Sequence, residues 1–237
     1  YGSDATVAQS RFELANSLLW EAGPNTSIVP HAPYSLSSEL FELIHNSQKG
    51  VQTIHYAESA DEYTYFEKGE GKIFDRLKKW GVKIPEFIPS GLSPIQSIEK
   101  WLSNELPLLL IHNTFITEED VSFITSNFDN PYFGLCPNAN LFIENQLPPQ
   151  HLLQNNDVNI CIGTDSLASN YGLSVLSEIK VLKTHFPFLD NHQLLKWASL
   201  NGAQALGFED KLGSFEIGKQ PGIIHLSDDL DLLRRIV

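Results

Sequence analysis

Val51-Gln52-Thr53-Ile54-His55-Tyr56-Ala57-Glu58 is the stretch of sequence that indicates the fold. Val51–His55 has the length and the β-branched content of a buried strand. A histidine at the point where such a strand stops can direct its imidazole out of the sheet toward a ligand. Glu58 can reach the same space from the loop that follows. The stretch therefore predicts a metal ligand beside a proton carrier.

Four further apolar runs end in polar residues in the same way. In a parallel α/β fold, ligands and catalytic groups gather at the carboxyl ends of the strands. We therefore expect the ends of all five runs to contribute to one site. The four further runs are Ser27–His31, Leu108–His112, Phe133–Asn138 and Val158–Asp165.

Each of these residues also has a structural interpretation. A single histidine after an apolar run is more often a hydrogen-bonded structural residue than a ligand. Asp165 could cap the next helix, and Glu58 could be a solvated loop carboxylate. The repeated placement of polar groups at strand ends favours the functional interpretation, because chance would seldom produce it. The remaining histidines are interpreted as structural: His45, His151, His185, His192 and His225.

The composition predicts one sizeable globular core, with 237 residues, 42% of them hydrophobic, and a mean hydropathy of −0.15. No apolar run reaches the roughly 18 residues of a membrane span, and no secretory signal is recognisable. Cys136 and Cys161 lie in predicted strands and are interpreted as buried free thiols. We therefore expect a cytoplasmic protein with no membrane partner. The net charge of −13 argues against a nucleic-acid partner.

The start of the sequence and the absence of methionine predict that the sequence is incomplete. The chain begins at Tyr1 and contains no methionine in 237 residues. Either the first part of a longer protein is missing, or methionines were modified and dropped, or both. An intact mass of 26.6 kDa would contradict this expectation.

Helical patterns alternate with the five strands. Asp61–Lys72, with its aromatic residues, is expected to form a long loop or short helix that contributes to specificity. Ile84–Leu92 is a proline-rich connection, and the chain after Asn138 leads to a proline-marked loop at Leu147–Pro149. The predicted helices are Thr6–Ala22, Ser38–Lys49, Ile73–Trp80, Ser93–Ser103, one from Thr117, Leu173–His185 and Asn191–Leu206.

This alternation predicts an α/β protein with a parallel sheet. Five β/α units are visible, whereas a closed (β/α)₈ TIM barrel needs eight, so we expect an incomplete barrel containing strands four to eight. Residues 1–207 would form the barrel part and residues 208–237 a tail that contributes to a small β-sandwich. An open doubly wound sheet is the alternative, but it would need a Gly-rich phosphate turn. Lys68–Lys72 is not such a turn, because its glycine spacing is wrong and Ile73 replaces Ser or Thr.

The chain resembles the amidohydrolase superfamily, in the branch of cytosine, guanine and S-adenosylhomocysteine deaminases and triazine chlorohydrolases. The resemblance covers roughly Pro30 to Leu226, and it depends on an ordered set of motifs rather than on any single one. These motifs are His31-Ala-Pro-Tyr-Ser35, His55-Tyr-Ala-Glu-Ser59, Leu110-Ile-His-Asn-Thr114, Cys136-Pro-Asn-Ala-Asn140, Gly163-Thr-Asp-Ser-Leu-Ala-Ser-Asn170 and Asn201-Gly-Ala-Gln-Ala-Leu-Gly207.

The resemblance implies one divalent metal ion, zinc or alternatively iron, at the mouth of a (β/α)₈ barrel. His55 and Asp165 would bind the metal, and Asp165 would also take a proton from the attacking water. Glu58 would carry a proton to a ring nitrogen, His112 would contact the developing oxyanion, and His31 would hold the substrate. The family's first two ligands form a His-x-His pair, which this sequence lacks.

Three functions follow from these implications. The first is deamination of an aminated heterocycle, such as a purine, a pyrimidine or an adenosyl-type compound. The second keeps the metal but changes the reaction to dechlorination or cyclic-amide hydrolysis. The third is a non-catalytic, metal-free barrel, supported only by the absent His-x-His pair. A small-molecule substrate is the expected partner, and the resemblance is compatible with a homo-oligomer.

Overall fold

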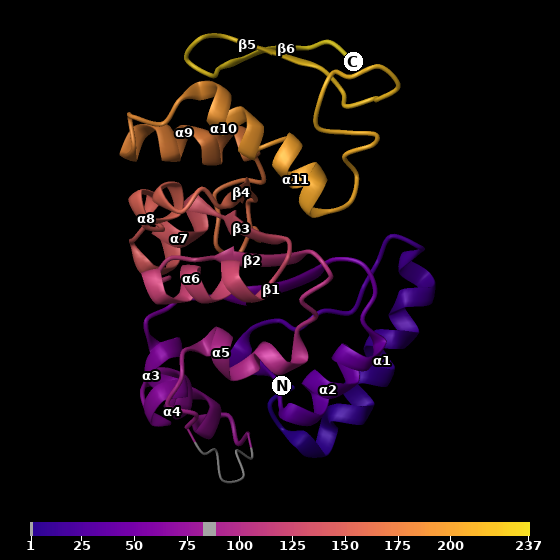
Figure 1. The fold of residues 1–237 in the computed structure, drawn as a ribbon, viewed down its shortest axis with the longest axis vertical. Helices are drawn as coiled ribbons and strands as arrows, with labels where there is room; N and C mark the ends of the chain where they lie inside the picture. The colour runs from indigo at the N-terminus through magenta and orange to yellow at the C-terminus, as the bar shows by residue number, and fades with distance from the viewer. Residues whose placement is uncertain (1, 83–88) are drawn as a thin grey trace. The chain divides into compact units, whose positions relative to one another are not determined.

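The computed structural model describes residues 2–82 and 89–237 of the chain, an α/β protein with two parallel strand pairs and a C-terminal antiparallel pair (Figure 1). The chain divides into two compact units, Tyr1–Pro131 and Tyr132–Val237. Each unit is described by itself. Within the described part of the chain, no helix combines the length and the apolar character needed to cross a membrane.

The first unit begins with a helical pair. A short 3₁₀ turn, η1 (Ala5–Val7), leads into α1 (Ala8–Ala22), and a second turn, η2 (Pro33–Ser35), precedes α2 (Ser38–Ser47). The Ser37 hydroxyl accepts a hydrogen bond from the amide of Leu40 at 3.3 Å, which caps the first turn of α2. The buried side chains Ala8, Leu40 and Ile44 form a cluster that joins α1 to α2.

Two parallel strands form the centre of the first unit. β1 (Gln52–Tyr56) pairs with β2 (Leu108–His112) in a register that places Tyr56 opposite His112. β2 buries three consecutive leucines, Leu108 to Leu110, as expected for a parallel strand covered on both faces, and β1 buries Ile54 and Tyr56. The buried Gln52 side chain donates to the carbonyl of Ser103 and accepts from its amide, both at 2.8 Å. These bonds fix the start of β1.

Helices surround this strand pair. After β1 come α3 (Asp61–Lys68) and α4 (Lys72–Lys79), and α5 (Pro94–Ile98) with η3 (Glu99–Trp101) precedes β2. After β2 comes α6 (Glu118–Asn127), whose N-cap Thr117 forms a capping box with Asp120. Each strand therefore ends in a short loop that leads directly into a helix.

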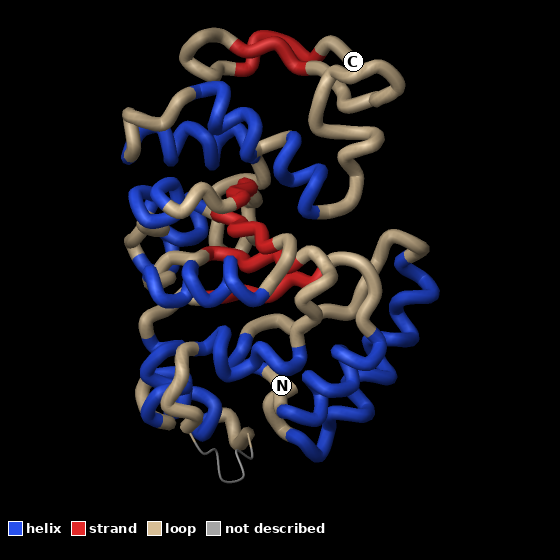
Figure 2. Tube along the Cα trace, in the orientation of Figure 1, coloured by secondary structure: helices blue, strands red, loops and turns tan. Residues whose placement is uncertain are grey.

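The second unit contains another parallel pair. β3 (Pro131–Leu135), which starts at the unit boundary, pairs with β4 (Asn159–Ile162), and α7 (Pro137–Glu144) and α8 (Gln150–Asn155) connect them. α9 (Val175–His185), α10 (Asn191–Trp197) and α11 (Leu200–Ala205) follow β4. The Asn201 side chain of α11 donates to the carbonyl of Ile160 at 2.7 Å. The C-terminal strands β5 (Ile224–Leu226) and β6 (Leu232–Arg235) pair antiparallel (Figure 2).

Most of the predicted elements are confirmed, and β2 has the predicted bounds. The predicted strand Ser27–His31 is wrong, because those residues form no strand. The predicted helix Asn191–Leu206 is two helices, α10 and α11, and α7 and α8 were not predicted. Asp61–Lys72 takes the short-helix alternative as α3. Most of the predicted connection Ile84–Leu92 lies outside the described residues.

The predicted α/β class with a small C-terminal β segment is confirmed. Within residues 2–82 and 89–237 the structure contains four strands in parallel pairs, half the number that a closed (β/α)₈ barrel needs. The division into residues 1–207 and 208–237 remains a prediction.

Candidate functional site

His55 is held in one tautomer by the backbone of His31. Its Nδ1 lies 2.7 Å from the His31 carbonyl oxygen, which can only accept a hydrogen bond, so Nδ1 carries the proton. In the neutral ring, Nε2 of His55 is then the nitrogen with the lone pair. The backbone amide of His55 donates to the same carbonyl at 2.9 Å, and the two imidazole rings are 4.5 Å apart. The His31 segment thus lies against β1 although it is not a strand.

His112 and Glu58 lie close to each other at the ends of β2 and β1. Nε2 of His112 lies 3.4 Å from Oε1 of Glu58, and the His112 side chain is 1% exposed whereas that of Glu58 is 20% exposed. The His112 ring stacks on the ring of His55 with 5.3 Å between their centroids. The first unit therefore brings together four of the five predicted site residues: His31, His55, Glu58 and His112.

Strained backbone marks the ends of the strands. Left-handed φ angles are unfavourable for residues with a side chain, and they gather where function requires a particular geometry. Seven non-glycine residues of the described chain have positive φ, and four of them lie at or just after strand ends. These four are Ala57 (48°), His112 (81°), Asn113 (57°) and Asp165 (56°).

A buried carboxyl group holds the loop after β1. Glu62, in the first turn of α3, is 1% exposed and accepts hydrogen bonds from the amides of Ala57 (3.1 Å), Glu58 (2.9 Å) and Ser59 (3.3 Å). Burial raises the pKa of Glu62 to about 8, with a further contribution from the charge of Glu58. Burial first, and then the charges of Glu62 and Glu58, also raise the pKa of the Tyr34 hydroxyl.

A second buried carboxyl group holds the loop after β2. Asp120 Oδ2 accepts from the Thr117 amide at 3.1 Å, from the Thr117 hydroxyl at 2.8 Å and from the Tyr63 hydroxyl at 2.5 Å. Tyr63 belongs to α3, so this bond joins α3 to the start of α6. Burial, followed by the charge of Asp120, raises the pKa of Tyr63. The helices after β1 and β2 are thereby tied to each other.

Asp165, the fifth predicted residue, follows β4 in the second unit, where Ser169 donates a hydrogen bond to its Oδ2. A third buried carboxyl group, that of Glu178 in α9, supports this region. It accepts from the amide of Asn138 at 2.7 Å and from the side chain of Asn170 at 2.7 Å. The same Asn170 amide group donates to the carbonyl of Thr164 at 2.7 Å, directly before Asp165.

The thiol of Cys136 lies close to this region but is not activated. Burial raises the pKa of Cys136, and the charges of Asp165 and Glu178 raise it further. Burial also raises the pKa of Cys161 to about 12. Both thiols are therefore protonated at neutral pH, as predicted for buried structural cysteines.

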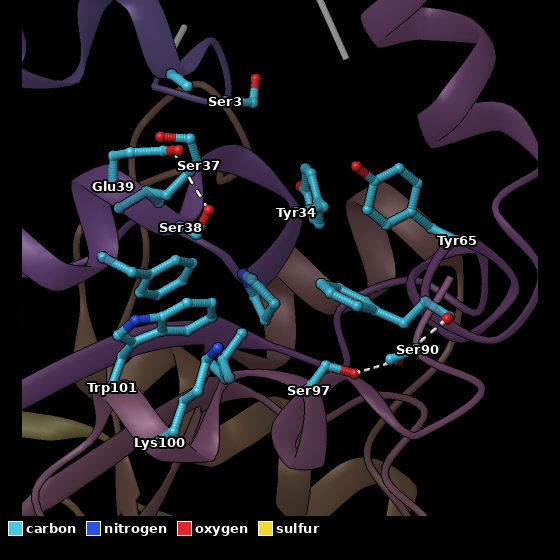
Figure 3. Close-up of a pocket in the computed structure, with 16 residues that line it drawn as sticks. Ser3, Tyr34, Ser37, Ser38, Glu39, Tyr65, Ser90, Ser97, Lys100 and Trp101 are labelled. Carbon is cyan, nitrogen blue, oxygen red and sulfur yellow. Dashed lines mark hydrogen bonds between the residues drawn. The ribbon is translucent and has the colours of Figure 1, made fainter. Parts of the chain in front are cut away.

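A cavity of about 420 Å³ lies elsewhere in the first unit. Tyr34 and Tyr65 lie on one side of it and Trp101 and Lys100 on the other (Figure 3). The Lys100 ammonium group lies 4.2 Å from the centre of a Trp101 ring, so this part of the lining is already engaged in a cation–π contact. None of the five predicted site residues lines this cavity.

Sequence reasoning missed Glu62, Asp120 and Glu178. All three lie in the first turn of a helix that follows a strand. That position is a usable signal, although acidic residues are also common there because they interact favourably with the helix dipole. Their burial, at 2% exposure or less, distinguishes them from ordinary capping residues.

Several known proteins are similar to this chain. A family model described as the amidohydrolase family matches residues 5–236. A 5-methylthioadenosine/S-adenosylhomocysteine deaminase from Saccharophagus degradans is 29% identical over 215 residues, covering 84% of this chain and 42% of that protein. A homologous deaminase from Teredinibacter turnerae is also 29% identical and is covered over 45% of its length. The chain thus spans less than half the length of these curated relatives.

Solved structures of deaminases are also similar to this chain. An adenosine deaminase from Xanthomonas campestris with bound zinc has a TM-score of 0.68 and 26% identity, covering 91% of this chain and 46% of that one. The aminofutalosine deaminase of Helicobacter pylori has a TM-score of 0.71 over 95% of this chain and 57% of that one, and at 21% identity it shows a shared fold. Because the family model covers nearly the whole sequence, this chain belongs to the amidohydrolase family.

Proposed function

We propose that the chain carries the strand-end residues of a metal-dependent hydrolase that removes the amino group of an aminated heterocycle. The observation that supports this most directly is the cluster of His55, Glu58 and His112. In it, a carboxylate lies 3.4 Å from one imidazole, and the two imidazole rings are 5.3 Å apart. A nitrogen ligand, a proton carrier and a buried imidazole at neighbouring strand ends suit metal-assisted hydrolysis.

The proposed cofactor is one divalent metal ion, zinc in preference to iron. His55 fits a ligand role because its Nδ1 is hydrogen-bonded to a carbonyl, which presents Nε2 to the metal, as is usual for metal-binding histidines. Asp165 is proposed as the second ligand because it lies just after β4 and because Ser169 donates a hydrogen bond to its carboxylate. The zinc in the Xanthomonas campestris relative supports this choice. When bound, the ion supplies Lewis-acid activation of water.

The chain's own side chains would perform the proton transfers. Asp165 accepts the proton of the attacking water. Glu58, which is partly exposed, gives a proton to a ring nitrogen of the substrate as the new C–O bond forms, so that negative charge does not accumulate. The proton taken up by Asp165 then passes to the amino group, which leaves as ammonia when the C–N bond breaks, and the hydroxyl proton of the adduct returns to Glu58. His112 donates a hydrogen bond to the oxygen on which charge develops. His31, which is exposed beside His55, holds the substrate.

The substrate class follows from the relatives. Two of them are named for deamination of 5-methylthioadenosine, S-adenosylhomocysteine or adenosine. We therefore propose a purine nucleoside or a related purine or pyrimidine as the substrate. Dechlorination or cyclic-amide hydrolysis would use the same residues, and the products distinguish them: ammonia supports the proposal, whereas chloride or a ring-opened amide supports the alternatives.

The test combines metal analysis with product release. The protein is expressed with its complete natural sequence, supplemented with zinc, and assayed for ammonia with a panel of purines, pyrimidines and adenosyl compounds. Glu58→Gln is compared with Glu67→Gln, a matched control at an exposed position of α3.

We expect the wild type and both variants to bind metal. Glu58→Gln should lose about 10²-fold or more in kcat, while Glu67→Gln keeps wild-type turnover. Wild-type turnover by Glu58→Gln would remove Glu58 from the mechanism. A wild-type protein that binds no metal after supplementation would support the non-catalytic alternative instead.

A further inference from the structure

We propose that Glu62 is a positioning residue for the reaction, because its carboxyl group holds the loop that aims Glu58 at His112. This inference rests on the proposed function, in which Glu58 transfers a proton. The carboxyl oxygens of Glu62 accept hydrogen bonds from backbone amides of the loop, so we expect its effect on the chemistry to pass mainly through the backbone.

The contacts of Glu62 cover the whole loop. Oε2 accepts from the amide of Ala57 at 3.1 Å, and Oε1 accepts from the amides of Glu58 and Ser59 at 2.9 and 3.3 Å. In return, the amide of Glu62 donates to the carbonyl of Ser59 at 3.1 Å. Three consecutive amides thus share one acceptor group, which fixes the direction of the chain on both sides of Glu58.

The loop needs such an anchor because its backbone is strained. Ala57 has a φ of 48° and is completely buried, and a left-handed conformation is unfavourable for alanine. The buried Ala57 amide also has to find an acceptor. Without the carboxyl group of Glu62, the turn would relax toward a commoner backbone conformation, and the side chain of the next residue, Glu58, would turn with it.

Glu58 has little tolerance for such a movement. Its carboxylate lies 3.4 Å from His112, and His112 cannot follow it, because that side chain is buried and stacked on His55. A displacement of about 1 Å at a reacting group can reduce a rate by about 10²-fold. The loop after β1 therefore links a residue of α3 to the proton-transfer step.

The experiment is a double-variant cycle in the complete zinc-loaded protein. Glu62→Gln is suitable because glutamine keeps one acceptor oxygen but places an NH₂ group against an amide donor. Glu67→Gln on α3 is the matched control, and Glu58→Gln with the double variant Glu58→Gln/Glu62→Gln completes the set. Ammonia release, metal content and hydrogen exchange of the Ala57–Ser59 amides are measured, below the melting temperature of every variant.

Glu62→Gln should lower kcat by about 10- to 100-fold, with KM within about threefold, normal metal content and faster exchange of the three amides. In the double variant, the Glu62 substitution should cause no further loss beyond that of Glu58→Gln, because Glu62 acts through Glu58. An additive loss would overturn the inference, as would wild-type kcat or unchanged amide exchange in Glu62→Gln. If Glu58→Gln itself is fully active, the proposed function fails instead.

Discussion

The best test of how the second unit is held together is the substitution Glu178→Gln. Glu178 is completely buried in α9 and accepts two hydrogen bonds of 2.7 Å, from the Asn138 amide and from the Asn170 side chain. Asn138 lies after β3 and Asn170 lies after β4. Glutamine has nearly the same volume, so the substitution changes the hydrogen bonds without creating a cavity.

The size of the effect can be worked out from these contacts. Glutamine has one acceptor oxygen and one NH₂ group, so it can satisfy only one of the two donors, and its NH₂ group then faces the other. A buried donor that loses its acceptor destabilises the folded state by about 1–3 kcal/mol. Glu178→Gln should therefore lower the free energy of unfolding by about that amount. In an Asn170→Ala background the loss should be smaller, because one donor is already absent.

Urea denaturation measures this effect, provided that the slope of the transition is unchanged between variants. Glu209→Gln, at an exposed position of the same unit, is the control and should lie within about 0.5 kcal/mol of the wild type. A Glu178→Gln protein as stable as the control would refute the reasoning. It would mean that neither bond contributes to stability and that the loops after β3 and β4 are held by other contacts.

Two further predictions concern stability. Since burial raises the pKa of Glu62 from 4.5 to about 8, the folded state holds this proton more tightly than the unfolded state. The free energy of unfolding should therefore fall, by up to about 4 kcal/mol, as the pH rises from 5 to 9. If the free energy of unfolding of Glu62→Gln fell with pH as steeply as that of the wild type, this prediction would be wrong. The second prediction compares two glycines with positive φ. A Cβ on Gly213 (φ 87°) would lie 2.9 Å from Ala203 Cβ and from Leu200 Cα, whereas a Cβ on Gly218 (φ 96°) would meet nothing within 4 Å. Gly213→Ala should therefore lower the melting temperature more than Gly218→Ala, and equal shifts would show that the close contacts are relieved without loss.

The strand ends could be predicted because buried parallel strands leave a distinctive pattern. Such strands are apolar throughout, so the first polar residue after the run marks the point where the chain leaves the sheet. Leu108–His112 illustrates this, since its predicted bounds and those of β2 coincide. Ser27–His31 has the same pattern but forms no strand. Pro30 lacks the amide that a ladder requires, and its fixed φ is equally compatible with extended chain outside a sheet.

The helices of the second unit show a different limit. α10 and α11 are separated near Ser199, which has φ −134° and ψ −79°. The apolar spacing continues across this break, so periodicity alone predicts one helix over Asn191–Leu206. α7 was missed for a related reason. Cys136-Pro137-Asn138 suggests a turn, but proline at the first position of a helix is favourable, because its missing amide would have had no partner there.

The predicted site residues share a property that their supporting residues lack. Each candidate ligand or proton carrier lies at or just beyond the end of an apolar run, and the sequence can show that. Glu62, Asp120 and Glu178 lie in helices, where their acidic character has an ordinary explanation in the helix dipole. Only the folded chain shows that each accepts hydrogen bonds from a loop after a strand.

Burying a carboxyl group is unfavourable unless its oxygens are well hydrogen-bonded. A fold that needed only stability could cover the same loops with apolar side chains and water. Three buried acids, each beside a loop with strained backbone or a candidate catalytic residue, indicate that these loops require one defined conformation. If Glu58 and Asp165 act as proposed, their reactivity would depend on residues that contact no substrate, and substitutions at those residues should impair the reaction before they unfold the protein.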